Sequence, residues 1–335
     1  MNVYIDKDNL VSYIRSSRDA RFEDCNRMLK RKLDIKFTFS KDEILSLDKA
    51  DAELVMMWMT QMSQGAGNSK DNVRWGVDFP PRPLKSNIHT TFSEEELSSV
   101  YLLNDEKIRQ LKALGILLYS DIGNEVETLS SLIQTDDYGF TKQQVIEDMP
   151  NWDVLRDYTS PCSDIILVDQ YVFAFEELYD VNICALIKET CSHAKDAKIN
   201  IVILTLPRCY DKRTKRSFTP NWVDIKNKIR SGVESSVGVK PNVTFVLSSK
   251  LEEHDRSMFT NYNFFESGDT FNYFDSKWRV ISDGRHIKIF SLADRDFFAN
   301  SIRFVKDMQT IIDKVKRVNK DNIIGDQKSN YLKFD

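Results

Sequence analysis

Three continuous apolar segments in the second half of the chain constrain its fold most strongly. They cover residues 164–169, 199–204 and 243–247. Each is short and rich in Ile, Leu or Val, which is typical of a fully buried strand. Segments with helical patterns lie between them, at residues 173–193 and 222–229. Strands that alternate with helices favour a mostly parallel sheet with helices on its faces, so we expect an α/β fold.

The first half of the chain repeats this alternation. Strands are expected at residues 2–6, 35–39, 100–103 and 116–119, and helices at residues 9–31, 40–65 and 105–114. A length of 335 residues is typical of two domains, and a polar, turn-rich passage separates the two halves. We therefore expect two α/β domains, each a mostly parallel sheet flanked by helices. The predicted divisions are a first domain at 1–135, a linker at 136–161, a second domain at 162–320 and a tail at 321–335.

Composition excludes several classes of function. The formal net charge is −4, so no global positive field attracts nucleic acid, and any nucleic-acid site must be local. The five cysteines contain no Cys-x2-Cys pair, which argues against a thiolate metal site. An odd number of cysteines without an export signal indicates reduced thiols, so we expect a cytoplasmic protein. No apolar run approaches the roughly 18 residues of a membrane-spanning helix, so no membrane span is expected.

A polar stretch after the third apolar segment carries the clearest chemical pattern. His254 and Arg256 are two residues apart, so on an extended strand their side chains share one face. A neutral imidazole can attack phosphorus or move a proton, and a guanidinium can hold the phosphate oxygens. Asn261 follows where the strand would end and can hydrogen-bond a phosphate, while Gly268 permits close approach of a ligand to the backbone. The pattern predicts a phosphate site.

The spacing of these four residues resembles the signature of the phospholipase D superfamily, His-x-Lys-x4-Asp-x6-Gly. His254 and Gly268 match it, whereas Arg256 replaces the lysine and Asn261 replaces the aspartate. The form is most similar to the degenerate phospholipase D-like module found at the C-terminus of MIT-domain proteins and in related bacterial proteins. The similarity extends to residues 168–171, which resemble the end of the opening strand of those modules. The two replacements weigh against turnover more than against anion binding.

This resemblance implies a set of roles. His254, Arg256 and Asn261 would be the catalytic residues, Arg256 and Gly268 would contact the phosphate, and the site would need no cofactor. Members of the superfamily use two such motifs, with one histidine as the nucleophile and the other as acid and base. This chain has one complete copy, so the resemblance implies a homodimer that brings a second His254 to the same phosphate.

Two further stretches contain similar residue types. His286-Ile287-Lys288 repeats the His-x-Lys beginning, but no acid and glycine follow in register. We interpret it as an ordinary strand, and the alternative is that it lines the site. Residues 208–216 contain five cations beside Tyr210 and follow a predicted strand. One interpretation is a solvated loop. The other is a clamp in which Lys212 and Arg213 bind a phosphate backbone.

The first half contains its own candidate site. Asp6, Glu43, Asp105 and Asp121 all come directly after predicted strands, and parallel strands bring such residues to one edge of a sheet. Three or four carboxylates can bind Mg²⁺ or Mn²⁺, which can hold a phosphodiester and activate water. The opening residues 3–6 resemble those of PIN-like ribonuclease domains, over roughly the first 130 residues. The alternative is that these acids only cap helices.

Together these patterns predict a protein that handles phosphodiesters. A nuclease or nucleic-acid-binding protein is the main hypothesis, and the resemblance implies a bacterial antiviral defence role. The alternatives are a non-catalytic module that binds phosphate or lipid headgroups and dimerises, and a scaffold for a partner enzyme. DNA, RNA and lipid all remain open as substrates.

Overall fold

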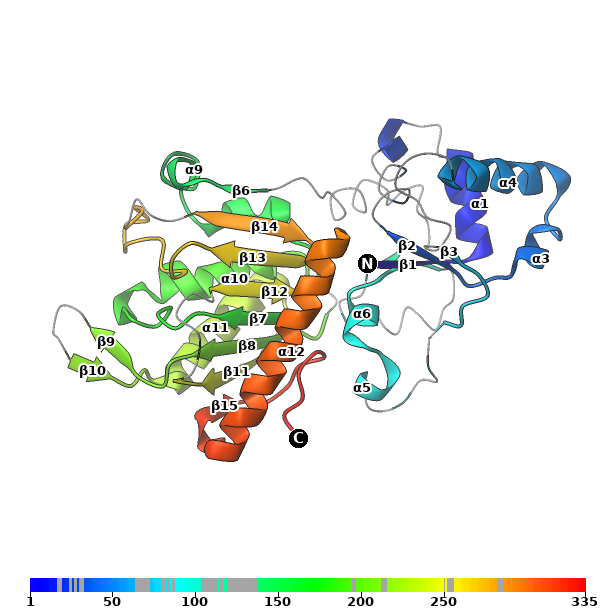
Figure 1. Ribbon diagram of the computed structural model, residues 1–335. Helices are drawn as coiled ribbons and strands as arrows, with labels where there is room; N and C mark the ends of the chain where they lie inside the picture. Colours follow the sequence, from blue (N-terminus) through cyan, green and yellow to red (C-terminus); the bar gives the residue numbers. More distant parts are fainter. Residues whose placement is uncertain are drawn as a thin grey trace. The chain divides into compact units, whose positions relative to one another are not determined.

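The structure, a computed structural model, confirms the α/β class (Figure 1). It divides into two compact units, which comprise residues 1–135 with 291–299 and residues 136–290 with 300–335. The residues that the structure describes are 1–16, 20–23, 26, 29, 33–63, 73–79, 82, 85, 88–103, 114, 117–119, 138–194, 197–211, 216–249, 251, 256–281 and 286–335. None of the helices in this part of the chain is long and apolar enough to cross a membrane.

Unit 1 contains a five-stranded sheet in the order β3-β2-β1-β4-β5. All four pairs of neighbouring strands are parallel, as the sequence predicts. Its strands are β1 (Asn2–Ile5), β2 (Asp34–Phe37), β3 (Val73–Arg74), β4 (Val100–Leu102) and β5 (Leu117–Tyr119). Its helices are α1 (Lys7–Ser16), η1 (Ala20–Phe22), α3 (Lys41–Ile44), α4 (Lys49–Ser63), α5 (Ile88–Thr91) and α6 (Glu94–Leu97). The strand order reverses between β1 and β4, the position at which open α/β sheets commonly bind ligands.

Unit 2 contains an eight-stranded sheet in the order β15-β11-β8-β7-β12-β13-β14-β6. Only β7, β8 and β11 pair in parallel, whereas β12 pairs with β7, β15 with β11 and β6 with β14 in antiparallel orientation. The predicted mostly parallel arrangement therefore holds for the centre of this sheet and not for its flanks. The strands are β6 (Tyr138–Phe140), β7 (Asp164–Val168), β8 (Asn200–Thr205), β11 (Asn242–Leu247), β12 (Ser257–Thr260), β13 (Asn263–Ser267), β14 (Ile287–Ser291) and β15 (Ile323–Gly325).

Helices cover both faces of this sheet. Figure 1 shows α12 (Arg295–Val318) crossing one face, with α10 (Ala185–Thr190) and α11 (Trp222–Val237) on the other. The helix expected over residues 173–193 is broken, because the 3-10 turn η5 (Glu176–Leu178) and the π-helical turn η6 (Asp180–Cys184) precede α10. The remaining elements are α9 (Lys142–Glu147), η4 (Trp152–Tyr158), η7 (Lys320–Asn322) and a separate two-stranded sheet of β9 (Cys209–Asp211) and β10 (Arg216–Phe218).

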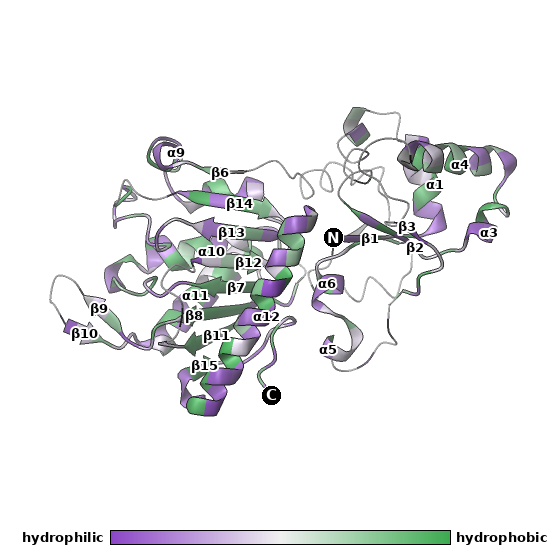
Figure 2. Ribbon diagram, viewed as in Figure 1, coloured by the Kyte–Doolittle hydropathy of each residue, from purple (hydrophilic) through white to green (hydrophobic). Residues whose placement is uncertain are grey.

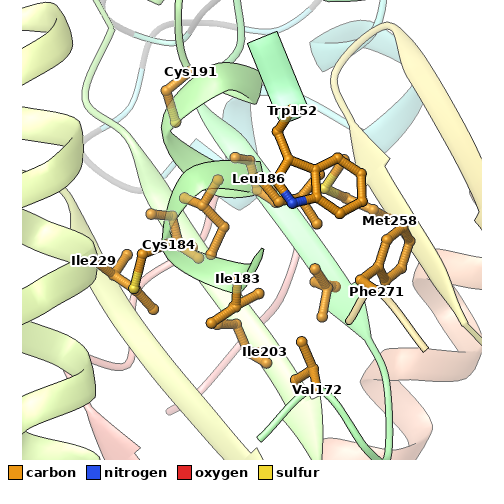
Figure 3. Close-up of a cluster of buried hydrophobic side chains, with 14 of the residues drawn as sticks. Trp152, Val172, Ile183, Cys184, Leu186, Cys191, Ile203, Ile229, Met258 and Phe271 are labelled. Carbon is orange, nitrogen blue, oxygen red and sulfur yellow. The ribbon is translucent and has the colours of Figure 1, made fainter. Parts of the chain in front are cut away.

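The core of unit 2 lies between the sheet and the helices on the α10 side. Figure 2 shows β7, β8 and β11 as the most continuously apolar strands. Trp152 is fully buried in this core, with its ring centroid 4.9 Å from that of Tyr273 and close to Met258 and Phe271 (Figure 3). The residues of the predicted linker from 138 onward form β6, α9 and η4, which belong to unit 2. Apolar side chains such as Trp152 are buried in the core of unit 2, although the surrounding sequence is polar and turn-rich.

The predicted tail is also an ordered part of unit 2. After β15, residues 326–332 form a strap along the amino ends of the parallel strands. Asp164, the first residue of β7, is fully buried and accepts hydrogen bonds from Ser329 Oγ at 2.6 Å and from the Asn330 backbone N–H at 2.8 Å. Asp326 binds Lys226 at 3.0 Å and also pairs with Arg230. These polar contacts fix the strap to the sheet.

Candidate functional site

Several candidate residues gather at the carboxyl end of β7 in the sheet of unit 2. We call this end of the sheet, opposite the strap, the carboxyl edge. Ser257 pairs with Val168 of β7, which places the preceding residue, Arg256, beside Asp169. The backbone N–H of Ser267 donates to the Arg256 carbonyl at 2.9 Å. The end of β13 therefore lies beside Arg256 on the side away from Asp169. The edge follows from the sequence because the apolar run of β7 stops at Asp169.

Asp169 is a buried anchor at this edge. Its Oδ2 accepts hydrogen bonds from Thr270 Oγ1 and from the Phe271 backbone N–H, both at 2.7 Å, and its Oδ1 accepts one from the Tyr171 N–H at 2.8 Å. Burial raises the pKa of this carboxyl, against the lowering effect of these bonds and of the nearby Arg256. Asp169 thus attaches the segment after β13 to the end of β7.

Arg256 is the cation of the edge. Its side chain is 17% exposed, its Nη1 donates to the Gly268 carbonyl at 3.4 Å, and Nη1 lies 3.9 Å from Asp269 Oδ1. Its Nε is buried and has no hydrogen-bond partner among the described residues. Alternation along β12 puts Arg256 on the same face as Met258, which belongs to the core. The guanidinium therefore retains hydrogen-bonding capacity in a largely desolvated position.

Gly268 and His286 complete the edge. The Gly268 N–H donates to the His286 carbonyl at 3.0 Å, and a Cβ on Gly268 would overlap the imidazole ring. His286 is partly exposed and precedes β14. We call Asp169, Arg256, Gly268 and His286 the carboxyl-edge site. An arginine, an imidazole and a glycine with accessible backbone are groups that suit an anion such as phosphate.

Comparisons with known proteins give no match. No protein-family model matches the chain, and neither a curated protein nor a solved structure resembles it significantly. The resemblance to phospholipase D-like and PIN-like domains stays a prediction from the motifs. Function must therefore be argued from the geometry of the site.

The structure brings two of the predicted phosphate-site residues together and separates a third. Arg256 and Gly268 are in contact, whereas Asn261 lies beyond the far end of β12. Five steps of extended chain separate Arg256 and Asn261, which corresponds to about 16 Å. Asn261 is fully buried, and its Oδ1 accepts from the backbone N–H groups of Ser163 at 2.9 Å and Asp164 at 3.2 Å. Asn261 therefore fixes the start of β7 and is not part of the carboxyl-edge site.

Several predicted residues lie outside the described part of the chain. They are His254 of the motif, Lys212 and Arg213 of the basic segment, and Asp105 and Asp121 of the predicted metal site. His286, expected mainly as an ordinary strand residue, lies at the site instead, in agreement with the alternative that its His-x-Lys pattern left open. The anchoring role of Asp169 was missed. The available signal was a carboxylate directly after the most apolar strand.

The two described acids of the predicted metal site both cap helices. Asp6 Oδ1 accepts from the backbone N–H of Asn9 at 2.7 Å in the first turn of α1. Glu43 Oε2 accepts from the backbone N–H of Ser40 at 2.7 Å, a capping box that lowers the pKa of Glu43. No group of three or more His, Cys, Asp or Glu side chains suited to a metal ion occurs within the described residues. Capping thus explains the positions of Asp6 and Glu43.

Proposed function

We propose that unit 2 binds the phosphate group of a phosphodiester at the carboxyl-edge site, with Arg256 as the main anion contact. The supporting observation is the buried Nε of Arg256, which has no partner among the described residues. A buried donor without an acceptor costs free energy. A phosphate oxygen that reaches the guanidinium at the exposed 17% of the side chain would give it a charge-assisted hydrogen bond.

The two carboxylates near Arg256 do not use up the hydrogen-bonding capacity of its guanidinium. Asp169 already accepts three hydrogen bonds from other donors, and burial favours its neutral form. Asp269 is 40% exposed and lies at 3.9 Å, close to the limit of an ion pair. At this separation the two charges do not form a close, bidentate ion pair. A bound phosphate would therefore not have to displace a strong internal ion pair.

The nuclease form of the proposal depends on His254, which lies two residues before Arg256 in the sequence. An imidazole next to a phosphate held by Arg256 can act as a nucleophile or as a proton carrier. The position of Asn261 favours the alternative, a module that binds phosphodiesters without cleaving them. Asn261 replaces the aspartate of the signature and contacts the start of β7.

Calorimetry with inorganic phosphate and with a dinucleoside monophosphate tests the binding proposal. We expect Arg256→Ala to weaken both interactions by about tenfold or more, because a charge-assisted hydrogen bond is lost. Arg256→Lys keeps the charge and should retain part of the affinity. Arg279→Ala is the matched control, since Arg279 is exposed and pairs with Asp275 at 2.7 Å. Unchanged affinity in a folded Arg256→Ala protein would disprove the proposal.

Cleavage requires a separate experiment. Labelled single- and double-stranded DNA and RNA are incubated with the protein in Mg²⁺ and in EDTA, beside the His254→Ala variant. Cleavage that His254→Ala abolishes and EDTA does not affect would support the nuclease form. Cleavage that is lost only in EDTA would instead favour metal-dependent cleavage by the acids of unit 1. Binding without cleavage would support the non-catalytic module.

A further inference from the structure

The two-stranded sheet of β9 and β10, here called the ribbon, follows β8 directly. Cys209 pairs with Phe218, Tyr210 with Ser217 and Asp211 with Arg216, all in antiparallel register. Figure 1 shows the ribbon beyond the end of β8, separate from the main sheet. The pattern predicts a loop here, whereas the described residues form a paired backbone.

The two faces of the ribbon differ in chemistry. Cys209 is 4% exposed and Phe218 is partly buried, and both pack into the core of unit 2. Tyr210 is 53% exposed and its cross-strand neighbour Ser217 is also exposed. Because side chains alternate along a strand, burial of one face holds the Tyr210 ring out in solvent.

Two exposed cations lie within two positions of Tyr210 or of its cross-strand neighbour Ser217. Arg208 precedes the ribbon and Arg216 begins β10, and both side chains are exposed. Neither has an ion-pair partner within the part of the chain that the structure describes. Two exposed guanidinium groups in the same ribbon segment as an exposed aromatic ring suit a polyanion with stacking surfaces better than a small ion.

The start of the ribbon follows a strand that borders the carboxyl-edge site. The backbone N–H of Asp169 donates to the carbonyl of Leu204, near the end of β8, at 3.1 Å. The ribbon follows β8 directly, so it leaves the sheet at the end where Arg256 lies.

We propose that the ribbon binds single-stranded nucleic acid, with Tyr210 stacking on a base and Arg208 and Arg216 contacting phosphates. That the bound nucleic acid extends to Arg256 rests on the proposed function, whereas its binding to the ribbon does not. An unpaired base is required because bases within a duplex are already stacked on each other. A membrane surface fits less well, since interfacial binding needs an apolar face. The described ribbon residues include no exposed aliphatic side chain, and Phe218 faces the core.

Fluorescence anisotropy with labelled single-stranded DNA and RNA of about 15 nucleotides tests the ribbon, a length within the range that binding modules cover. A duplex of the same sequence and vesicles of anionic phospholipid are the competing ligands. We expect Tyr210→Ala to weaken single-strand binding by about tenfold, and the double variant Arg208→Ala/Arg216→Ala to reduce the salt-dependence slope by about 1.4. The control is Lys277→Ala/Arg279→Ala, which removes two exposed cations elsewhere in unit 2.

The outcomes separate this inference from the proposed function. Wild-type affinity for single strands in both ribbon variants would overturn the inference, as would tighter binding of the duplex or of the vesicles. Ribbon variants should still bind inorganic phosphate normally, because Arg256 is unchanged. If Arg256→Ala keeps phosphate binding while the ribbon variants lose the oligonucleotide, the carboxyl-edge proposal fails and the ribbon inference stands. Thermal melting of each variant confirms that it is folded.

Discussion

Gly268 lies so close to His286 that a methyl group on Gly268 would overlap the imidazole ring. The backbones of the two residues are also joined, through the hydrogen bond from the Gly268 N–H to the His286 carbonyl at 3.0 Å. This bond restricts movement of either segment. A side chain at position 268 would therefore have to push the ring of His286 away from the edge.

We expect Gly268→Ala to reduce the free energy of unfolding by less than about 1 kcal/mol, because the ring that it displaces is the far end of the partly exposed His286 side chain. It should also weaken phosphate binding, because the displaced ring disturbs the site around Arg256. Urea denaturation measures the first effect and calorimetry the second. Gly232→Ala is the control, since Gly232 lies within α11 and an added Cβ meets no atom within 4 Å. That change should stabilise the protein by about 0.5–1 kcal/mol. Equal effects of the two substitutions would contradict the steric argument.

Asp164 gives the strap a dependence on pH. Burial raises the pKa of this carboxyl to about 6, although hydrogen bonds from Ser329 and Asn330 oppose the rise. An unfolded aspartate titrates near pH 3.9. The contribution of Asp164 to the free energy of unfolding is complete below about pH 3.9 and is lost as the pH rises toward 6. We expect wild type to lose about 2 kcal/mol relative to Asp164→Asn between pH 4 and pH 7, measured by urea denaturation.

Asp326, in the same strap, should behave in the opposite way. Burial alone would raise its pKa, but the Val243 N–H, Lys226 and Arg230 together hold the pKa below its ordinary value. The stabilisation is present above the unfolded pKa and is lost as the pH falls below about 4. Wild type should therefore lose stability relative to Asp326→Asn only in acid. Parallel pH profiles for the two variants would show that the charge environments of Asp164 and Asp326 do not differ as described.

Substitution of Asp6 can distinguish its role as a helix cap from a role as a metal ligand. Asn is as good a helix cap as Asp, whereas Ala is not. We expect Asp6→Ala to cost about 1 kcal/mol of unfolding free energy and Asp6→Asn to cost much less. If the acids of unit 1 also bind Mn²⁺, calorimetry should show binding that both variants weaken, because both remove the carboxylate. Unchanged Mn²⁺ binding in Asp6→Asn would leave Asp6 with capping alone.

Association of unit 2 is the last expectation. The motif supplies one His254 per chain, so a composite site needs a two-fold dimer. Light scattering should give about twice the 39.0 kDa mass of one chain. A cysteine at position 254 should then cross-link two chains under mild oxidation, whereas Val318→Cys, at an exposed residue that ends α12, should not. A monomer at high concentration would rule out the composite site and leave phosphate binding by Arg256 unaffected.

The sequence by itself determined the local elements. The strand expected at residues 164–169 forms as Asp164–Val168, and the one at 199–204 forms as Asn200–Thr205. Apolar runs of this length leave few alternatives to a buried strand, and the helix caps at Asp6 and Ser40 depend only on neighbours in the chain. The motif predicted that Arg256, Asn261 and Gly268 lie together, and of these only Arg256 and Gly268 are in contact.

Only the tertiary structure decided which distant residues meet. The antiparallel pairing of β12 with β7 brought Arg256 to Asp169 and carried Asn261 to the opposite edge. The pairing of β13 with β14 placed His286 against Gly268. A local pattern specifies that a strand is buried, but not which strand lies beside it. That choice depends on how all the apolar faces and backbone hydrogen bonds of unit 2 are satisfied together.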